Sequence, residues 1–122
     1  MFPIYWHQFV ENHQLAGKSA CLGETVDLST LGADMKFLTE AQSIDELTNF
    51  WPGFGVSKDG YVPVASCSIG SGDYYYINTN DGQDGPLYRV YHDAVDLDGY
   101  KTEDAVAKVL DHYEELLRHV ES

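Results

Sequence analysis

Residues 61–91, YVPVASCSIGSGDYYYINTNDGQDGPLYRVY, carry the clearest strand pattern of this chain. They hold three short runs rich in β-branched and aromatic residues, at 61–65, 74–78 and 87–91, and glycine and aspartate separate them. Between the second and third runs lies NDGQDG, residues 80–85, whose residue types accept a positive φ and favour a tight reversal. The pattern predicts three strands in an antiparallel meander, with a hairpin between the last two.

Helices are expected on the N-terminal side of these strands. Pro3 suits a first helical turn, and aromatic and aliphatic residues then recur at helical spacing up to residue 10. Residues 39–49 have the spacing of a second helix, which ends before Trp51-Pro52 because a residue that precedes proline is disfavoured in a helix. Between these helices, residues 17–33 are expected to form a loop with at most one short strand, and residues 35–38 a short strand.

The last part of the chain has the strongest helical pattern. Thr102 can cap a helix whose first turn holds Glu103 and Asp104, which places negative charge at the positive end of the helix dipole. At about 100° per residue, the apolar residues that follow fall within one arc of roughly 140°. We therefore expect a closing helix over residues 102–121, with this stripe facing the core. The stripe consists of Ala105, Val106, Val109, Leu110, Tyr113, Leu116, Leu117 and Val120.

Length and composition predict one folded domain, residues 1–122, of the α+β class, in which helices flank a mostly antiparallel or mixed sheet. The chain has 43% apolar and 13% aromatic residues and only 4 prolines, which is typical of a globular protein. Cys21 and Cys67 are too few for a disulfide framework, and we find no secretion signal or membrane span in the sequence. A cytoplasmic location with reduced thiols is expected.

The charge of the chain is strongly negative. Twenty acidic residues against seven basic ones give a net charge of −13, and residues 61–122 hold twelve of the acids. Such a surface repels nucleic-acid phosphates and anionic lipids, so we expect neither nucleic acid nor membrane as a partner. A field of this sign steers basic proteins into contact. A need for solubility alone would also explain the excess of acidic residues.

Four catalytic or ligand-binding patterns carry no weight in this sequence. The glycine-rich residues 68–73 precede a predicted strand and end in Asp73, whereas a phosphate loop needs a helix N-terminus and no repelling acid. No register of the acidic turn 78–85 puts a glutamate at the twelfth position of a calcium loop. No nucleophile elbow is present, and with twenty acids some carboxylate pair always lies at glycosidase distance. We expect a protein that is not an enzyme and that has no cofactor.

One metal-binding pattern stays open. His112, Glu115 and His119 are spaced three and four residues apart, so in a helix they stand on one face and could chelate a metal. No cysteine or further histidine nearby in the sequence completes the set, so no metal is expected, and zinc titration by calorimetry is the test.

The aromatic strand 74–78 offers the best candidates for partner binding. Because a strand alternates its faces, Tyr75 and Ile77 point one way and Tyr74 and Tyr76 the other. One face enters the core, and the other is either covered by a helix or exposed as an aromatic interface flanked by acids. The candidate partner-binding residues are Asp73, Tyr74, Tyr76, Asp81, Asp84 and Asp93.

Several segments resemble the SUKH superfamily. They are the helix around 3–9, Trp51 before a short linker, the strand with Val62-Pro63-Val64, the Gly-Asp-aromatic segment 70–78, the strand 86–92 and the closing segment 102–121. The resemblance covers most of the chain, and the Gly-Asp-aromatic strand is its most specific part. It departs from the family at His13, where glycine is common, and at Asn78, where aspartate is frequent.

The resemblance implies a bacterial immunity protein that binds and neutralises a cognate toxin domain, with eukaryotic relatives associated with cell-wall regulation. Together with the charge, it leads us to expect a toxin with a basic surface, such as a nuclease domain. Two alternatives remain. One is a regulatory or scaffold module for a cellular protein, and the other, ranked last, is an enzyme acting through carboxylates or a histidine-bound metal.

Overall fold

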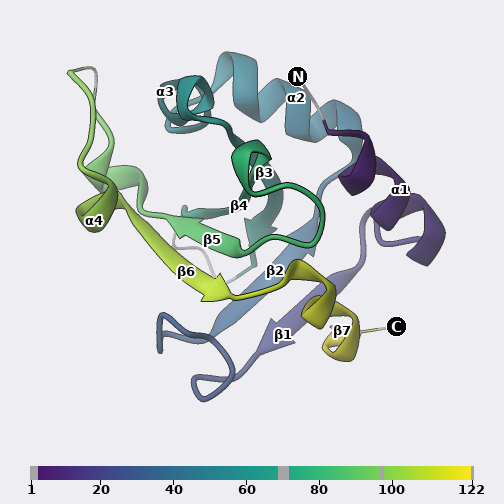
Figure 1. Ribbon diagram of the computed structural model, residues 1–122. Coiled ribbons are helices and arrows are strands. Elements are labelled where there is room, and N and C mark those ends of the chain that lie inside the picture. Colours follow the sequence, from purple (N-terminus) through teal and green to yellow (C-terminus); the bar gives the residue numbers. More distant parts are fainter. Residues whose placement is uncertain (1–2, 69–71, 97, 122) are drawn as a thin grey trace.

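The computed structural model describes residues 3–68, 72–96 and 98–121, so residues 69–71 of the glycine-rich segment lie outside the described part. Figure 1 shows helices packed around a sheet, with the longer helices in the N-terminal half of the chain. The α-helices are α1 (Ile4–His13), α2 (Glu40–Asn49), α3 (Gly53–Val56) and α4 (Thr102–Ala105). The strands are β1 (Ser19–Leu22), β2 (Ala33–Phe37), β3 (Tyr61–Cys67), β4 (Tyr74–Asn78), β5 (Leu87–Val90), β6 (Val106–Leu110) and β7 (Val120–Glu121). The 3₁₀ helices are η1 (Ser57–Asp59), η2 (Thr79–Asp81), η3 (His92–Ala94) and η4 (Tyr113–Arg118).

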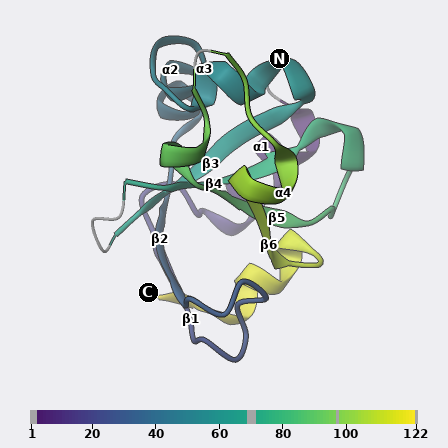
Figure 2. The same cartoon turned by 90° about the vertical axis from the view of Figure 1, so that its left-hand side faces the viewer.

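The strands form one antiparallel sheet in the order β6-β5-β4-β3-β2-β1-β7. The view turned by 90° shows that this sheet is curled (Figure 2). The α+β fold class with an antiparallel sheet is therefore confirmed. The predicted meander is confirmed too, since β3, β4 and β5 are consecutive neighbours and η2 lies in the reversal between β4 and β5.

Both faces of the central strands are buried. Tyr75 and Ile77 of β4 belong to a core with Trp6 and Phe9 of α1 on one face of the sheet. Tyr76 belongs to a second core on the other face. That second core also contains Val56 of α3, Tyr61, Val90, Val95 and Ala105. Burial on two faces explains why β3 and β4 are almost continuously apolar.

The two N-terminal helices form as predicted. Helix α2 starts after Thr39, whose side chain accepts a hydrogen bond from the Gln42 amide at 3.1 Å, while the Gln42 side chain accepts one from the Thr39 amide at 2.9 Å. This capping box satisfies two backbone donors at the helix start. The helix ends at Asn49, close to the boundary that Trp51-Pro52 predicted.

The single closing helix predicted over 102–121 is wrong. Its residues form the short α4, then β6 and η4, and finally β7. Most of the predicted core stripe is nevertheless buried: Ala105, Val109, Leu110, Tyr113 and Leu116 are all 2% exposed or less. One continuous helix would bury nearly the same residues as a short strand followed by a 3₁₀ helix does. The spacing of the apolar residues therefore did not distinguish these two structures.

Tertiary pairing decides between these alternatives. β6 hydrogen-bonds along the otherwise open edge of β5, and its β-branched Val106 and Val109 suit a strand. The segment then crosses to the opposite edge of the sheet, where β7 pairs with β1. On the way, the Tyr113 ring packs edge-on against Trp6 with a centroid distance of 5.0 Å.

A buried ion pair fastens the loop between β1 and β2 to the sheet. Asp27 of the loop is 1% exposed and Arg89 of β5 is 5% exposed. The Arg89 Nη2 donates to Asp27 Oδ2 at 3.1 Å, to the Gly32 carbonyl at 2.7 Å and to the Tyr75 hydroxyl at 3.3 Å. The guanidinium also lies 5.2 Å from the centre of the Tyr75 ring. Nothing in the local sequence around either residue indicates that these two charges meet.

Candidate partner-binding surface

The six predicted partner-binding residues lie at different places in the fold. Asp81 and Asp84 line one hollow, Asp73 and Asp93 flank His92, and Tyr74 lines a groove beside α2. Tyr76 is 0% exposed. The candidates therefore do not form one continuous site.

Tyr76 is not available to a partner in this structure. Its ring is packed in the core beneath α3, and its hydroxyl has no hydrogen-bond partner among the described residues. Burial raises its pKa. The alternation of faces in β4 was predicted correctly, but α3, η3 and α4 cover the face that Tyr76 occupies, so the idea of an exposed Tyr76 is wrong.

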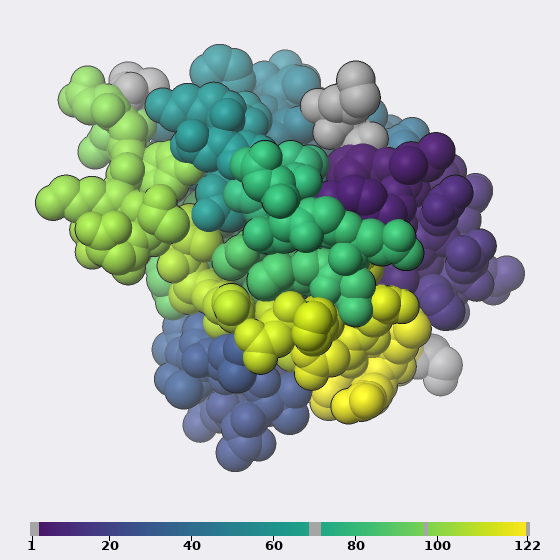
Figure 3. Space-filling view, in the orientation of Figure 1, coloured from purple at the N-terminus to yellow at the C-terminus, as the bar shows by residue number. Residues whose placement is uncertain are grey.

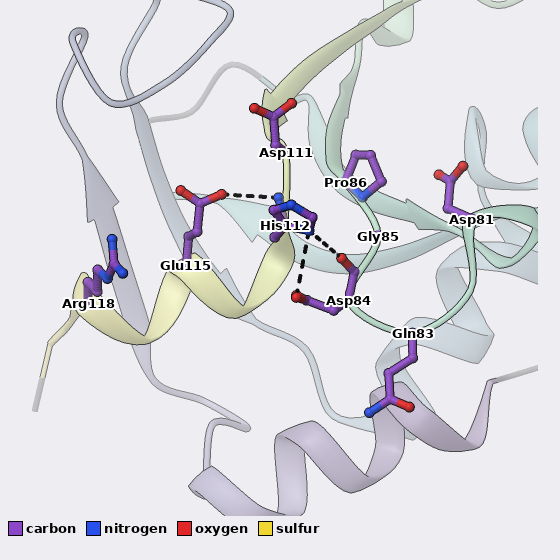
Figure 4. A pocket seen from close by; sticks show the side chains of 9 residues that line it. All are labelled: Asp81, Gln83, Asp84, Gly85, Pro86, Asp111, His112, Glu115 and Arg118. Carbon is purple, nitrogen blue, oxygen red and sulfur yellow. Dashed lines mark hydrogen bonds and ion pairs between the residues drawn. The ribbon is translucent and has the colours of Figure 1, made fainter.

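The hollow around Asp81 and Asp84 is open and acidic, with a volume of about 860 Å³. Figure 4 shows Asp84, His112 and Glu115 converging at its centre. The Asp84 carboxylate accepts a hydrogen bond from the Glu114 amide at 3.0 Å, and the Asp84 carbonyl lies 2.9 Å from His112 Nδ1. These contacts hold the β4–β5 turn against the C-terminal segment.

The metal-binding pattern loses its geometric basis. His112 precedes η4 and His119 follows it, so the three residues do not share one face of an α-helix. Glu115 Oε2 instead accepts a hydrogen bond from the His112 amide at 3.1 Å. Within the described ranges, no group of three or more His, Cys, Asp or Glu side chains is arranged to hold a metal ion.

Asp73 and Asp93 hold His92 from two sides. Asp73 Oδ1 lies 2.6 Å from His92 Nδ1 and accepts a hydrogen bond from the His92 backbone amide at 2.9 Å. Asp93 Oδ1 lies 3.0 Å from His92 Nε2 and is largely exposed. The hydrogen bond with Asp73 is the main reason why the pKa of His92 is raised above its usual value. Asp73 thus ties the start of β4 to η3, and Asp93 remains on the surface.

A patch of exposed aromatic residues lies where α2 meets α3, and the sequence interpretation missed it. We call Phe50, Trp51 and Phe54 the aromatic patch; they are 50%, 39% and 60% exposed. The rings of Trp51 and Phe54 are 6.2 Å apart. Isolated apolar side chains on a surface are common, but three adjacent aromatic residues are the composition typical of an interface core.

Local backbone geometry fixes this patch. Trp51 Nε1 donates to the Val95 carbonyl at 2.7 Å, which joins the patch to the segment after η3. A Cβ at Gly55 would lie 2.8 Å from the Trp51 ring, and one at Gly53 would overlap the Glu46 carbonyl oxygen. Both glycines therefore allow a close approach that any side chain would obstruct. The position of the aromatic patch is therefore set by specific backbone contacts and one hydrogen bond.

Acidic residues border the aromatic patch. Asp45 and Glu46 of α2 line the same groove as Phe50 and Trp51. Asp93 and Asp96 are exposed residues of the segment that contains Val95, whose carbonyl accepts the hydrogen bond from Trp51. In the space-filling view, the light-green surface of residues 92–96 and 98–100 lies beside the teal surface of α3 (Figure 3). Aromatic anchors with a charged rim are the usual anatomy of a protein interface.

A groove adjoins the patch on the side of the sheet. It has a volume of about 570 Å³, and Phe50, Trp51, Tyr74 and Glu46 are among the residues that line it. Burial is the main cause that raises the pKa of Glu46, and the neighbouring Tyr74 acts against this shift. Tyr74 is thus the one predicted tyrosine that the structure leaves accessible.

No family model matches this chain, and neither a curated protein nor a solved structure is significantly similar to it. The SUKH resemblance stays a prediction. Among the described residues, no helix has the length and apolar character needed to cross a bilayer.

The sequence held a partial signal for the patch. The segment FWPGFG, residues 50–55, concentrates three aromatic residues between glycines and a proline, which is unusual for a solvated connection. From the sequence, Trp51 was assigned only to the end of a predicted helix and to the SUKH resemblance, and no role was predicted for Phe50 or Phe54. Whether the three rings face the core or the solvent is decided by how α3 packs.

Proposed function

We propose that this chain is a cytoplasmic immunity protein that binds a cognate toxin domain with a basic surface and blocks it by occlusion. The observation that carries the proposal is the aromatic patch with its border of carboxylates. Aromatic side chains supply large contact areas at low entropic cost, and they are frequent hot spots in interfaces. The SUKH resemblance adds the biological role, and the proposal involves no catalysis, no cofactor and no nucleic acid.

Charge supports a basic partner. The net charge of −13 gives a field that accelerates the approach of a positively charged protein. Asp93 and Asp96 beside the patch and the acids of the hollow around Asp84 extend this field over a broad surface. The acids then act mainly on the association rate, while the aromatic patch acts on dissociation.

The test begins with the gene beside the one encoding this chain. If that gene encodes a toxin with a variable C-terminal domain, the two products are expected to co-purify, and the chain should abolish the toxin's activity in stoichiometric amounts. The association rate should fall by about tenfold or more between low and high salt. Co-purification with an unrelated cellular protein, and none with the neighbouring product, would contradict the immunity role.

Matched variants locate the surface. Phe54→Ala removes the most exposed ring of the patch and is expected to raise the dissociation rate about tenfold or more, as hot-spot truncations do. Glu24→Gln changes an exposed residue of the β1–β2 loop, which lies at the opposite end of the molecule from α3 in both ribbon views (Figures 1 and 2). Equal effects of the two substitutions would show that the patch is not the interface.

A further inference from the structure

The groove beside the aromatic patch combines aromatic faces with a carboxylate. Its lining includes Phe50 and Trp51 from the chain after α2, Tyr74 from β4 and Glu46 from α2. Phe50 and Trp51 are 50% and 39% exposed, so ring surface is open to a ligand. Stacking on such rings favours a planar cation, above all a guanidinium.

The carboxylate of Glu46 lies beside the aromatic surface of the groove. Glu46 of α2 and Tyr74 of β4 line the groove together with Phe50 and Trp51. A carboxylate in this position can accept the paired N–H donors of a guanidinium whose face lies on the rings.

The charges around the groove favour a cation. Asp45 and Glu46 contribute two carboxylates, and Lys36 contributes one ammonium group. Asp45 also accepts a hydrogen bond from Asn49 at 2.7 Å. The lining therefore keeps a net negative charge, and Lys36 is the only described lining residue that repels a cation.

We propose that this groove receives an arginine side chain of the partner protein, with the guanidinium against Glu46 and its face on the aromatic rings. The inference rests on the proposed function, because it takes the partner to be a basic protein. It goes further by naming the side chain that is recognised and the residues that recognise it.

Tryptophan fluorescence can test this directly. The chain has two tryptophans, and Trp6 is 0% exposed while Trp51 lines the groove. A short peptide containing several arginines is titrated into the whole protein, and a peptide of the same sequence with neutral citrulline is the control. The arginine peptide is expected to change the Trp51 emission saturably and to bind at least tenfold more tightly than the citrulline peptide, since the charge-assisted hydrogen bonds are lost.

Three variants divide the contributions. Glu46→Gln keeps the shape of the side chain and is expected to weaken arginine binding about tenfold. Lys36→Gln removes the repelling cation and is expected to strengthen it. Glu24→Gln removes one negative charge, as Glu46→Gln does, but at a distant place, and it is expected to leave the affinity unchanged within about twofold. Circular dichroism and thermal unfolding establish that each variant is folded.

The outcomes separate this inference from the proposed function. Heat of binding by calorimetry without a change in Trp51 emission, or equal losses in Glu46→Gln and Glu24→Gln, would overturn the arginine groove and leave a basic partner possible elsewhere on the surface. Saturable binding that depends on Glu46, together with failure to capture the neighbouring toxin, would support the groove and refute the immunity role.

Discussion

Replacing Arg89 by methionine is expected to destabilise the protein by about 3–5 kcal/mol. The guanidinium is the buried cation that faces Asp27, and its Nη2 makes all three of its side-chain hydrogen bonds. After the substitution, Asp27 Oδ1 keeps its bonds to the amide and hydroxyl of Ser29 at 2.7 Å each, whereas Oδ2 loses Arg89. An almost fully buried carboxylate is then left without a compensating charge.

Urea unfolding followed by circular dichroism measures this loss. With a slope of about 1–3 kcal/mol per molar urea, a loss of this size lowers the midpoint by roughly 2 M. Such a change is a large part of the total stability of a domain, which is about 5–15 kcal/mol. Asp27→Asn alone leaves a buried cation and is also expected to destabilise the fold.

The double variant tests the reasoning most sharply. When Asp27→Asn and Arg89→Met are combined, both charges are gone, so the loss is expected to be smaller than the sum of the single losses by about 0.5–3 kcal/mol. Additive losses would mean that the two side chains do not interact energetically. A loss below about 1 kcal/mol for Arg89→Met would show that water reaches the pair, and the account of a buried charge would be refuted.

Three further predictions concern single positions. Gly53→Ala places a methyl group against the Glu46 carbonyl oxygen and is expected to lower the free energy of unfolding in urea by about 1–3 kcal/mol. In the control Gly23→Ala, the added methyl group meets nothing within 4 Å, so the stability is expected to stay nearly unchanged. Similar losses in both variants would contradict the close approach at Gly53. Thr39→Ala removes the cap of α2 and is expected to cost about 1 kcal/mol, which thermal unfolding can detect. The raised pKa of His92 means that its charged form is favoured in the folded state, so its contribution is fully present below its unfolded value of about 6.5 and is lost as pH rises through the folded pKa. His92→Gln is therefore expected to reduce the loss of stability between about pH 6 and about pH 8 relative to the unchanged protein, and parallel pH profiles would argue against it. The pKa of His112 is raised as well, chiefly by its hydrogen bond with the Asp84 backbone, so the comparison must be made against the unchanged protein.

The sequence predicted well where local signals and burial agree. The β-branched and aromatic runs of β3, β4 and β5 are separated by turn residues, and they form the meander as expected. The helices α1 and α2 carry their own start and stop signals, in Pro3, Thr39 and Trp51-Pro52. These features depend on residues that are neighbours in the sequence, so they can be predicted from the sequence alone.

Much of the candidate surface could not be found in this way. Asp73, Tyr74 and Asp93 were singled out, but the sequence did not indicate that Asp73 would be bound to His92 or that Tyr74 would share a groove with Glu46. The idea that Tyr76 is exposed was wrong, because the alternation of a strand shows which residues share a face and not whether a helix covers that face. The aromatic patch was missed because exposure depends on the packing of α3.

Local sequence patterns were sufficient to predict the fold class, the central meander, the negative charge and the closing apolar stripe, of which Ala105, Val109, Leu110, Tyr113 and Leu116 enter the core. Tertiary structure alone decided that residues 106–110 form a strand, that Asp27 meets Arg89 across 62 positions of the chain, and that three aromatic rings remain on the surface. The physical reason is that a local pattern fixes which side chains avoid water, whereas the open edge of β5, the position of α3 and the pairing of distant charges arise only once the chain is folded.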